Sequence, residues 1–292
     1  MMYTPEQFHQ KLAAQRRRVQ ILFVAHTAVY AIALLLMVFQ QMTVGMVLGV
    51  ANLLLHFLLI RGQLKGYSRS ATDANLLLGV CQPLEEPRCT GGAGMTDEAF
   101  DALALLPIRR GKGRSLMAHN GFAGRLNDME VQGFEATLHY PVEKNGKTDF
   151  QFLNGTLLTA GWQQPVPGSC LLLHKHLLQP GAEQAFLEQH HLRTVTPDSP
   201  ALQDFLLCAE HPEQVPQAVC RHLALLAQAA PGLGAVRLVP DQAAVFLVNR
   251  FYSRRIKVRE LPDAAALTTN PLPERDAVFA LFRWWSRFDN QE

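Results

Sequence analysis

The sequence predicts an α+β fold, in which a two-helix transmembrane hairpin at the N-terminus is followed by one cytosolic domain. An uncharged apolar run extends from Val19 to Ile60, with Arg18 before it and Arg61 after it. The chain after Arg61 has the mixed polar and apolar composition of a globular domain. Within that part, strand patterns joined by tight turns are separated from helical stretches, which is typical of antiparallel hairpins with segregated helices.

The apolar run is too long for a single crossing of a membrane. One crossing needs about 20 apolar residues, whereas a continuous helix over this run would be about 60 Å long. The polar pair Gln40-Gln41 stands at its midpoint. We therefore predict two antiparallel helices, from about Val19 to Phe39 and from about Thr43 to Ile60, that form a tight hairpin within residues 19–61.

Small and polar residues inside the run indicate how the two helices pack. Gly45 and Gly49 lie one turn apart on the second helix and would let a neighbouring backbone approach closely. Asn52 is expected to join the two helices through a hydrogen bond. His26 and His56 lie toward the cytoplasmic ends of the helices, where a neutral imidazole reaches the interface. Whether the glycines also join two copies of the chain into a homo-oligomer is left open.

Basic residues flank the run on both sides and predict its orientation. They are Lys11, Arg16, Arg17 and Arg18 before the run, and Arg61, Lys65 and Arg69 after it. Because basic flanks stay in the cytoplasm, residues 1–18 form a basic cytosolic N-terminus and the C-terminal domain is cytosolic too. The lipid bilayer is thus the first expected partner of this two-pass protein.

Composition excludes one class of function and indicates a compartment. The chain has 27 Lys and Arg against 25 Asp and Glu, a net charge of +2 that argues against a nucleic-acid-binding protein. Its 5 cysteines are an odd number without a compact framework, which fits a reducing compartment.

The cytosolic part divides into a linker at 62–95 and a domain at 96–292. Thr96 is a plausible cap for a helix that ends by Pro107. Alternating apolar residues from Phe134 to Tyr140 predict a half-buried strand, and Asn145-Gly146 predicts the turn of a hairpin. The further expected elements are a strand at Ser169–His174, helices at Ala182–His190 and Gln214–Ala229, a hairpin of Ala235–Val239 with Ala243–Val248, and an amphipathic helix after Pro273.

This order of segments resembles the bacterial family called domain of unknown function 3137. The matching stretches are Phe100 to Pro107, Phe152 to Thr159, Pro167-Gly168, Pro197 to Phe205 and the hairpin around Val245. The resemblance covers most of residues 96–288. It implies a bacterial protein with N-terminal membrane helices followed by one cytosolic α+β domain, and it transfers no activity and no catalytic residue. Together with the basic flanks, this predicts a protein of the bacterial cytoplasmic (inner) membrane with both termini in the cytoplasm.

A basic loop is the main candidate for a ligand site. Its cations are Arg109, Arg110, Lys112 and Arg114, with glycines between them. Glycine lets a backbone approach a phosphate and arginine forks onto its oxygens. The Arg110 and Arg114 spacing is similar to that of cyclic-di-GMP-binding PilZ domains, although Glu130 stands where their second motif has serine. The alternative is a solvated loop, close to anionic headgroups.

No pattern in the sequence indicates catalysis, a metal or a cofactor. Nucleophile-elbow, zinc-protease and phosphate-loop motifs are missing from it. The pairs His174 with His176, His190 with His191, and Cys208 with His211 do not repeat at the spacing of a structural zinc site. An enzyme with a dispersed active site remains an alternative.

The C-terminal helix places apolar residues on one face. Phe282, Trp285 and Phe288 share that face, and Trp284 is next to it. These four residues could pack on the domain core, lie at the membrane interface or bind a partner.

We therefore expect a membrane-anchored adaptor or scaffold whose cytosolic domain binds a protein partner. A membrane-tethered sensor of an anionic small molecule such as a nucleotide, acting through the basic loop, is the second hypothesis.

Overall fold

The computed structural model describes residues 4–39, 41–91, 95–108, 113–144, 147–163, 165–166, 168–178, 182–253 and 256–288. The chain forms two compact units. The hairpin unit comprises Met1–Gly79 and Ser253–Thr269, and the sheet domain comprises Val80–Tyr252 and Asn270–Glu292.

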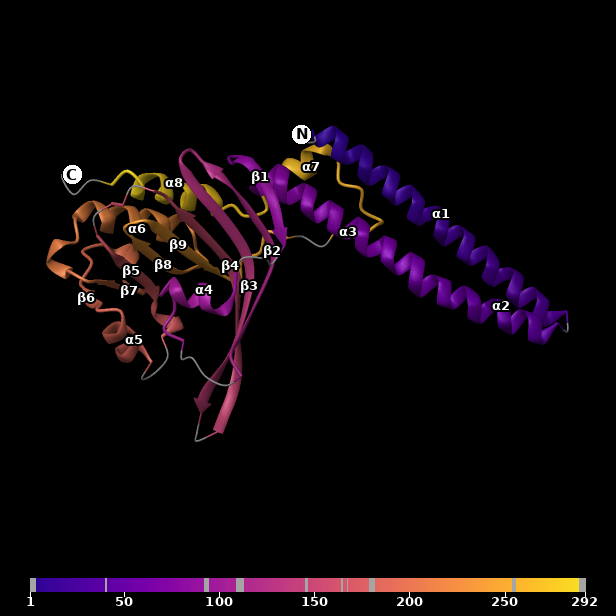
Figure 1. Ribbon diagram of the computed structural model, residues 1–292, viewed down its shortest axis with the longest axis horizontal. Helices are drawn as coiled ribbons and strands as arrows, with labels where there is room; N and C mark the ends of the chain where they lie inside the picture. The colour runs from indigo at the N-terminus through magenta and orange to yellow at the C-terminus, as the bar shows by residue number, and fades with distance from the viewer. Residues whose placement is uncertain are drawn as a thin grey trace. The chain divides into compact units, whose positions relative to one another are not determined.

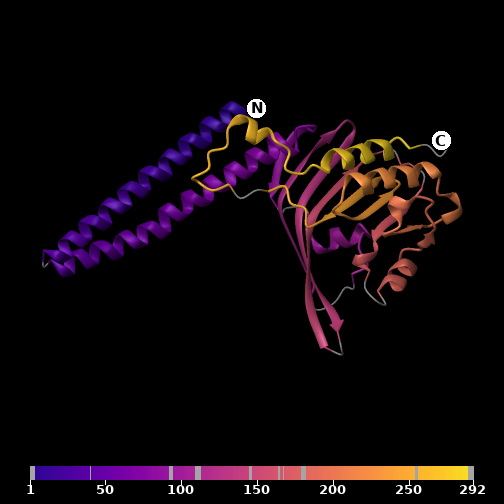
Figure 2. The ribbon, with the colours of Figure 1, turned by 180° about the vertical axis from the view of Figure 1, so that it is seen from behind.

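Two long helices form the hairpin unit. Helix α1 (Pro5–Val38) begins at a capping box made by Thr4 and Gln7, and it lies beside α2 (Met42–Leu55) in both views of the ribbon (Figures 1 and 2). Helix α2 continues through a π-helical turn, His56–Ile60, into α3 (Arg61–Asn75). Both helices are long and apolar enough to cross a membrane, and only 6% and 17% of their most apolar windows are buried. A core helix of a soluble protein would instead bury most of that surface.

The base of the hairpin unit is held together by a segment from far along the chain. The cluster consists of Phe8, Leu12, Tyr67, Ala71 and Ala74 from the helices, and Ile256 and Leu267 from the returning segment. The hydroxyl of Tyr67 donates to the carbonyl of Glu260 at 2.6 Å. Asn75 donates to the carbonyl of Leu267, in the short helix α7 (Ala264–Thr268), at 3.1 Å.

The region expected as a linker, 62–95, contains regular structure. It includes α3 and the edge strand β1 (Glu85–Gly91). Helix α3 continues beyond Arg61 because Ala71 and Ala74 are buried against Ile256 and Leu267 of the segment that returns from far along the chain. Strand β1 forms because it pairs with β2. Both partners are distant in sequence, so local composition did not reveal them.

Nine strands form one sheet in the sheet domain. Their order is β1-β2-β3-β4-β9-β8-β5-β7-β6, and neighbouring strands are antiparallel. After β1, the strands are β2 (Ser115–Leu126), β3 (Met129–Lys144), β4 (Lys147–Gly161), β5 (Cys170–His174), β6 (Arg193–Val195), β7 (Phe205–Ala209), β8 (Leu233–Val239) and β9 (Gln242–Val248). This arrangement confirms the predicted α+β class.

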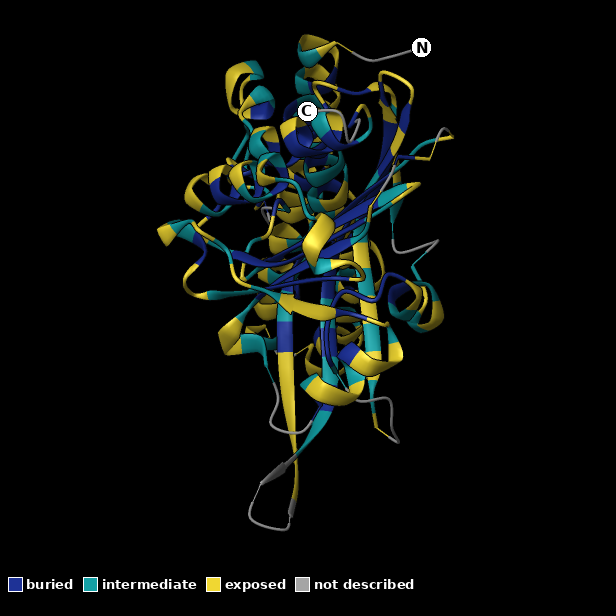
Figure 3. Cartoon of the chain, turned by 90° about the vertical axis from the view of Figure 1, so that its left-hand side faces the viewer, coloured by how far each residue is buried: buried dark blue, intermediate teal, exposed yellow. Residues whose placement is uncertain are grey.

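Helices cover both faces of this sheet. Helices α4 (Asp97–Ala102) and α5 (Glu183–Gln189) lie on one face, and α6 (Gln217–Ala229) and α8 (Arg275–Trp285) lie on the other (Figure 1). Because successive side chains of a strand point to opposite faces, one strand contributes to the core on both sides of the sheet. In β5, Leu171 and Leu173 pack in the core beneath α4 and α5, whereas Leu172 points to the opposite face. Figure 3 shows the buried middle of the sheet between these layers.

Candidate functional site

Of the four cations of the predicted basic loop, the structure describes Arg114 alone. Arg109, Arg110 and Lys112 lie outside the described residues. The side chain of Arg114 is only 6% exposed, and it forms an ion pair with Asp101 and lies 4.0 Å from Asp97. Its guanidinium therefore binds acids at α4 and is not presented to a ligand.

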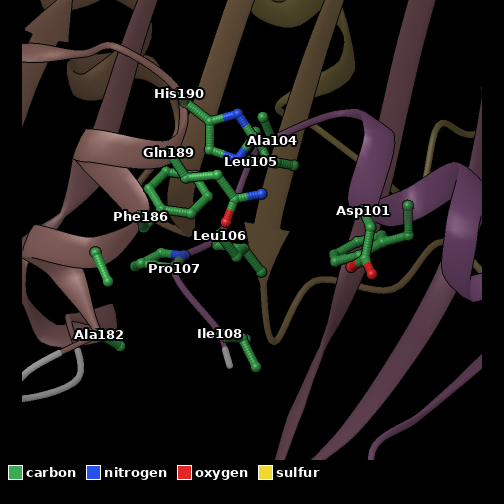
Figure 4. Close-up of a pocket in the computed structure, with 12 residues that line it drawn as sticks. Asp101, Ala104, Leu105, Leu106, Pro107, Ile108, Ala182, Phe186, Gln189 and His190 are labelled. Carbon is green, nitrogen blue, oxygen red and sulfur yellow. The ribbon is translucent and has the colours of Figure 1, made fainter. Parts of the chain in front are cut away.

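A pocket of about 270 Å³ lies between α5 and the segment that follows α4. Figure 4 shows Phe186 and Gln189 of α5, and His190 directly after that helix, on one side of it, facing Leu105 and Leu106. The carboxylate of Asp101 stands at the far edge and is already paired with Arg114. The described residues that line the pocket include no Arg or Lys that could hold a phosphate.

The two glycines of the hairpin have different surroundings. A Cβ at Gly45 would lie 2.7 Å from the carbonyl oxygen of Ala33 and 2.7 Å from Cγ of Met37, both on α1. A Cβ at Gly49 would have nothing within 4 Å. Gly45 thus permits the close approach of α1 and α2, and Gly49 does not contribute to it.

Asn52 joins the two helices of the hairpin. Its Nδ2 donates to the carbonyl of His26 at 3.0 Å, and its Oδ1 lies 2.9 Å from Nδ1 of the same histidine. The ring of His56 lies 4.6 Å from that of His26, measured between centroids. One asparagine therefore satisfies both a backbone carbonyl and a side chain in an apolar setting, where unpaired polar groups are costly.

The apolar face of the C-terminal helix α8 belongs to the domain core. Phe282, Trp285 and Phe288 are buried. The indole nitrogen of Trp285 donates to the carbonyl of Val239 at 3.0 Å. Trp284 is half-buried and stacks on His222 at a centroid distance of 3.9 Å. The first three residues are thus core residues rather than contacts for a membrane or a partner.

An exposed aromatic strip, which the sequence did not reveal, lies on the hairpin of β3 and β4. Phe150 and Phe152 are 44% and 62% exposed, and the ring of His139 stacks on each at 4.7 Å. Met117 of β2, opposite Thr137 and 55% exposed, extends the same face. We call Met117, His139, Phe150 and Phe152 the aromatic strip.

The hairpin that carries this strip continues past the neighbouring strands. Strands β3 and β4 pair from Glu130 and Gly161 to Lys144 and Lys147. Strand β9 pairs with β4 only from Gly155 onward. Among the described strands, the first half of β4 therefore has no neighbour on its β9 side. We call this end of the β3–β4 hairpin the arm. Figures 1 and 3 show that the arm extends beyond the rest of the sheet, and Figure 3 shows that much of it is exposed.

The described residues include no group of three or more His, Cys, Asp and Glu that could hold a metal ion. His174 and His176 do approach each other, with their Nδ1 atoms 2.6 Å apart. Burial lowers the pKa of His174, and His176 beside it lowers this pKa further.

No protein-family profile matches the chain. No curated protein is significantly similar to it. Among solved structures it is similar to the crystal structure of the mycobacterial trehalose monomycolate transport factor A, TtfA, with a TM-score of 0.35 and 10% sequence identity, over 74% of this chain and 96% of that one.

Proposed function

We propose that this chain is a two-pass protein of the bacterial cytoplasmic membrane whose cytosolic sheet domain binds another protein through the aromatic strip. The observation that carries the proposal is the exposure of Phe150 and Phe152 on the first half of β4, which pairs with no described strand on its β9 side. Soluble domains rarely leave large apolar groups together on their surface unless a partner covers them.

The strand edge suggests how the partner is held. An extended segment that adds to a sheet edge gains main-chain hydrogen bonds, and its alternate side chains give specificity. The first half of β4 offers such an edge. Phe150 and Phe152 point to one face of it, because they are two residues apart. A partner strand with apolar residues at alternate positions would cover both rings.

Packing on the opposite face of the arm keeps the aromatic strip exposed. On the opposite face of the same arm, Leu138, Tyr140 and Leu153 pack into the core beneath α4. That packing fixes the register of β3 and β4, since a shift by one residue would exchange the two faces. The membrane hairpin adds a second advantage, because a tether raises the effective concentration of a binding domain near membrane partners.

Site-specific photo-crosslinking in the native membrane tests this function. We expect a photoreactive phenylalanine analogue at position 152 to capture one reproducible partner through an extended segment. The matched control is the analogue at Phe251, which is as exposed as Phe150, at 44%. The double substitution Phe150→Ser with Phe152→Ser should abolish capture by an analogue at Met117, whereas Phe251→Ser should not. Equal capture from positions 152 and 251, or none from either, would contradict the proposal.

The anionic-sensor hypothesis now depends on fewer residues. With Arg114 bound to Asp101, only Arg109, Arg110 and Lys112 remain as cations for a nucleotide. Their joint replacement by serine should remove nucleotide binding by the intact protein, if it occurs, and a protein that binds no nucleotide ends this hypothesis.

A further inference from the structure

Two histidines meet inside the long apolar helices of the hairpin unit. His26 belongs to α1, and His56 is the first residue of the π-helical turn that follows α2. Their ring centroids lie 4.6 Å apart. Ionisable side chains within membrane helices are rare, and they mark ion and proton sites. π-helical turns are also rare and frequently occur at functional sites. Both features coincide at His56.

The hydrogen bonds of Asn52 fix which ring nitrogen of His26 is free. Nδ2 of Asn52 donates to the carbonyl of His26 at 3.0 Å, so its Oδ1 is the atom that lies 2.9 Å from Nδ1 of the ring. An amide oxygen only accepts, and therefore Nδ1 of His26 carries the proton and Nε2 presents a lone pair. A histidine that binds a metal normally donates its other ring N–H to an oxygen in this way. Asn52 thus prepares His26 as a metal ligand.

His56 has a ring nitrogen without a partner. Its Nδ1 is buried and makes no hydrogen bond to any described residue. Besides His26, its ring neighbours are Phe23 and Phe57, at centroid distances of 6.1 and 5.8 Å, and neither can hydrogen-bond to it. An unpaired polar atom is costly in an apolar setting. With its proton on Nε2, the ring presents the lone pair of Nδ1, so His56 can supply a second ligand atom.

The separation of the two rings suits two ligands of one metal ion. Imidazoles that bind a tetrahedral zinc ion through N–Zn bonds of about 2.0–2.1 Å have centroids roughly 5 Å apart. The centroids of His26 and His56 are 4.6 Å apart. A closed site needs four ligands, whereas the described part of one chain contains no group of three or more His, Cys, Asp and Glu that could hold a metal. One copy therefore provides half of a site.

A second copy can approach α2 on the side of His56. Gly49 and His56 are seven residues apart, and residues at this spacing share one face of a helix. A Cβ at Gly49 would meet nothing within 4 Å, so the described chain does not cover this part of the face. Glycine at such a position lets another backbone approach closely. Two hairpins that meet here would bring four imidazoles together.

We propose that His26 and His56 bind a transition-metal ion together with the same two residues of a second copy, so that one ion joins two hairpins. Imidazole nitrogen suits zinc, copper and nickel among such ions. Without the ion we expect a monomer in which Gly49 faces lipid. The site belongs to the hairpin unit and is independent of the aromatic strip, so the failure of one proposal leaves the other untouched.

Zinc is the probe, because it has no redox chemistry and is bound tetrahedrally by nitrogen ligands. The full-length protein in neutral detergent, stripped of metal with EDTA and then freed of the chelator, should sediment as a monomer. Addition of zinc chloride should convert it into a dimer in sedimentation velocity. Gel filtration followed by elemental analysis should then find that His26 and His56 account for one zinc ion per dimer, as the loss of that ion in their variants.

Variants decide whether these histidines hold the ion. His26→Gln and His56→Gln should each abolish the zinc-dependent dimer, with helix content unchanged by circular dichroism. Asn52→Ser should raise the zinc concentration needed for half-dimerisation by roughly 10–100-fold, because Asn52 positions His26. His176→Gln is the matched control, since His174 and His176 also form a close pair, with Nδ1 atoms 2.6 Å apart, but lie in the sheet domain. This control should dimerise as the native protein does.

The contact between the two copies has its own variant. Gly49→Val should prevent the zinc-dependent dimer, because the added methyl groups occupy the face on which the second hairpin lies. A protein that zinc leaves monomeric would overturn the proposal. So would a dimer that persists in His26→Gln and His56→Gln, or one that forms equally well in EDTA.

Discussion

At the scale of single residues, the missing Cβ of Gly45 sets how closely α1 and α2 approach. Substitution Gly45→Val would place atoms within 2.7 Å of the backbone oxygen of Ala33, so the helices must separate. We expect this change to destabilise the hairpin by about 1–3 kcal/mol. Gly49→Val should change its stability by less than about 0.5 kcal/mol, because a Cβ there meets nothing. Unfolding of the metal-free protein in increasing dodecyl sulfate, followed by circular dichroism, measures both.

The same pair of variants addresses self-association. If Gly49→Val destabilises the hairpin as much as Gly45→Val does, Gly49 must pack against a second copy of the chain rather than lipid. The expected difference between the two variants would then be contradicted, and the homo-oligomer left open by the sequence would be supported.

Residues differ in how far the sequence reveals their surroundings. Asn52 could be predicted because a polar side chain inside an apolar membrane run has few ways to be satisfied. His56 could be noticed as an ionisable residue inside the same run. Its unpaired Nδ1 could not be predicted, because it depends on where α1 and the π-helical turn place the neighbouring rings.

At the scale of elements, α8 completes the layer that covers one face of the sheet. Trp285 is buried and hydrogen-bonded to Val239, whereas Trp284 only stacks on His222. We expect Trp285→Ala to destabilise the sheet domain by about 3–5 kcal/mol and Trp284→Ala by about 1 kcal/mol. Thermal unfolding followed through the remaining tryptophans measures both. Equal effects would show that Trp285 is not the anchor of this helix.

The elements that the sequence predicted are those with strong local signals. Alternation around Leu138 and the Asn145-Gly146 pair predicted the hairpin of β3 and β4, although residues 145–146 themselves lie outside the described residues. Edge strands β1 and β6 and the first strand of the long meander, β2, were not predicted. Their pairing depends on distant partners, and Pro87 and the glycines near Gly121 weaken any local strand pattern.

At the scale of the whole molecule, the proposed topology follows from charge at both ends of the apolar run. Arg18 and Arg61 should remain in the cytoplasm, so Gln41 at the turn should reach the far side of the membrane. Cys89 of the sheet domain is an exposed thiol and reports the location of that domain. A membrane-impermeant maleimide can therefore test the crossing and the orientation in one experiment.

The cysteines at positions 41 and 89 should differ in their reaction with the maleimide. In intact bacterial cells from which the outer barrier has been removed, Gln41→Cys in a Cys89→Ser background should react without lysis. Cys89 in the native chain should react only after lysis. The reverse pattern would place the sheet domain and its aromatic strip outside the cytoplasm. Protection at both positions would mean that the hairpin does not cross, and its large exposed apolar surface would then need another partner to cover it.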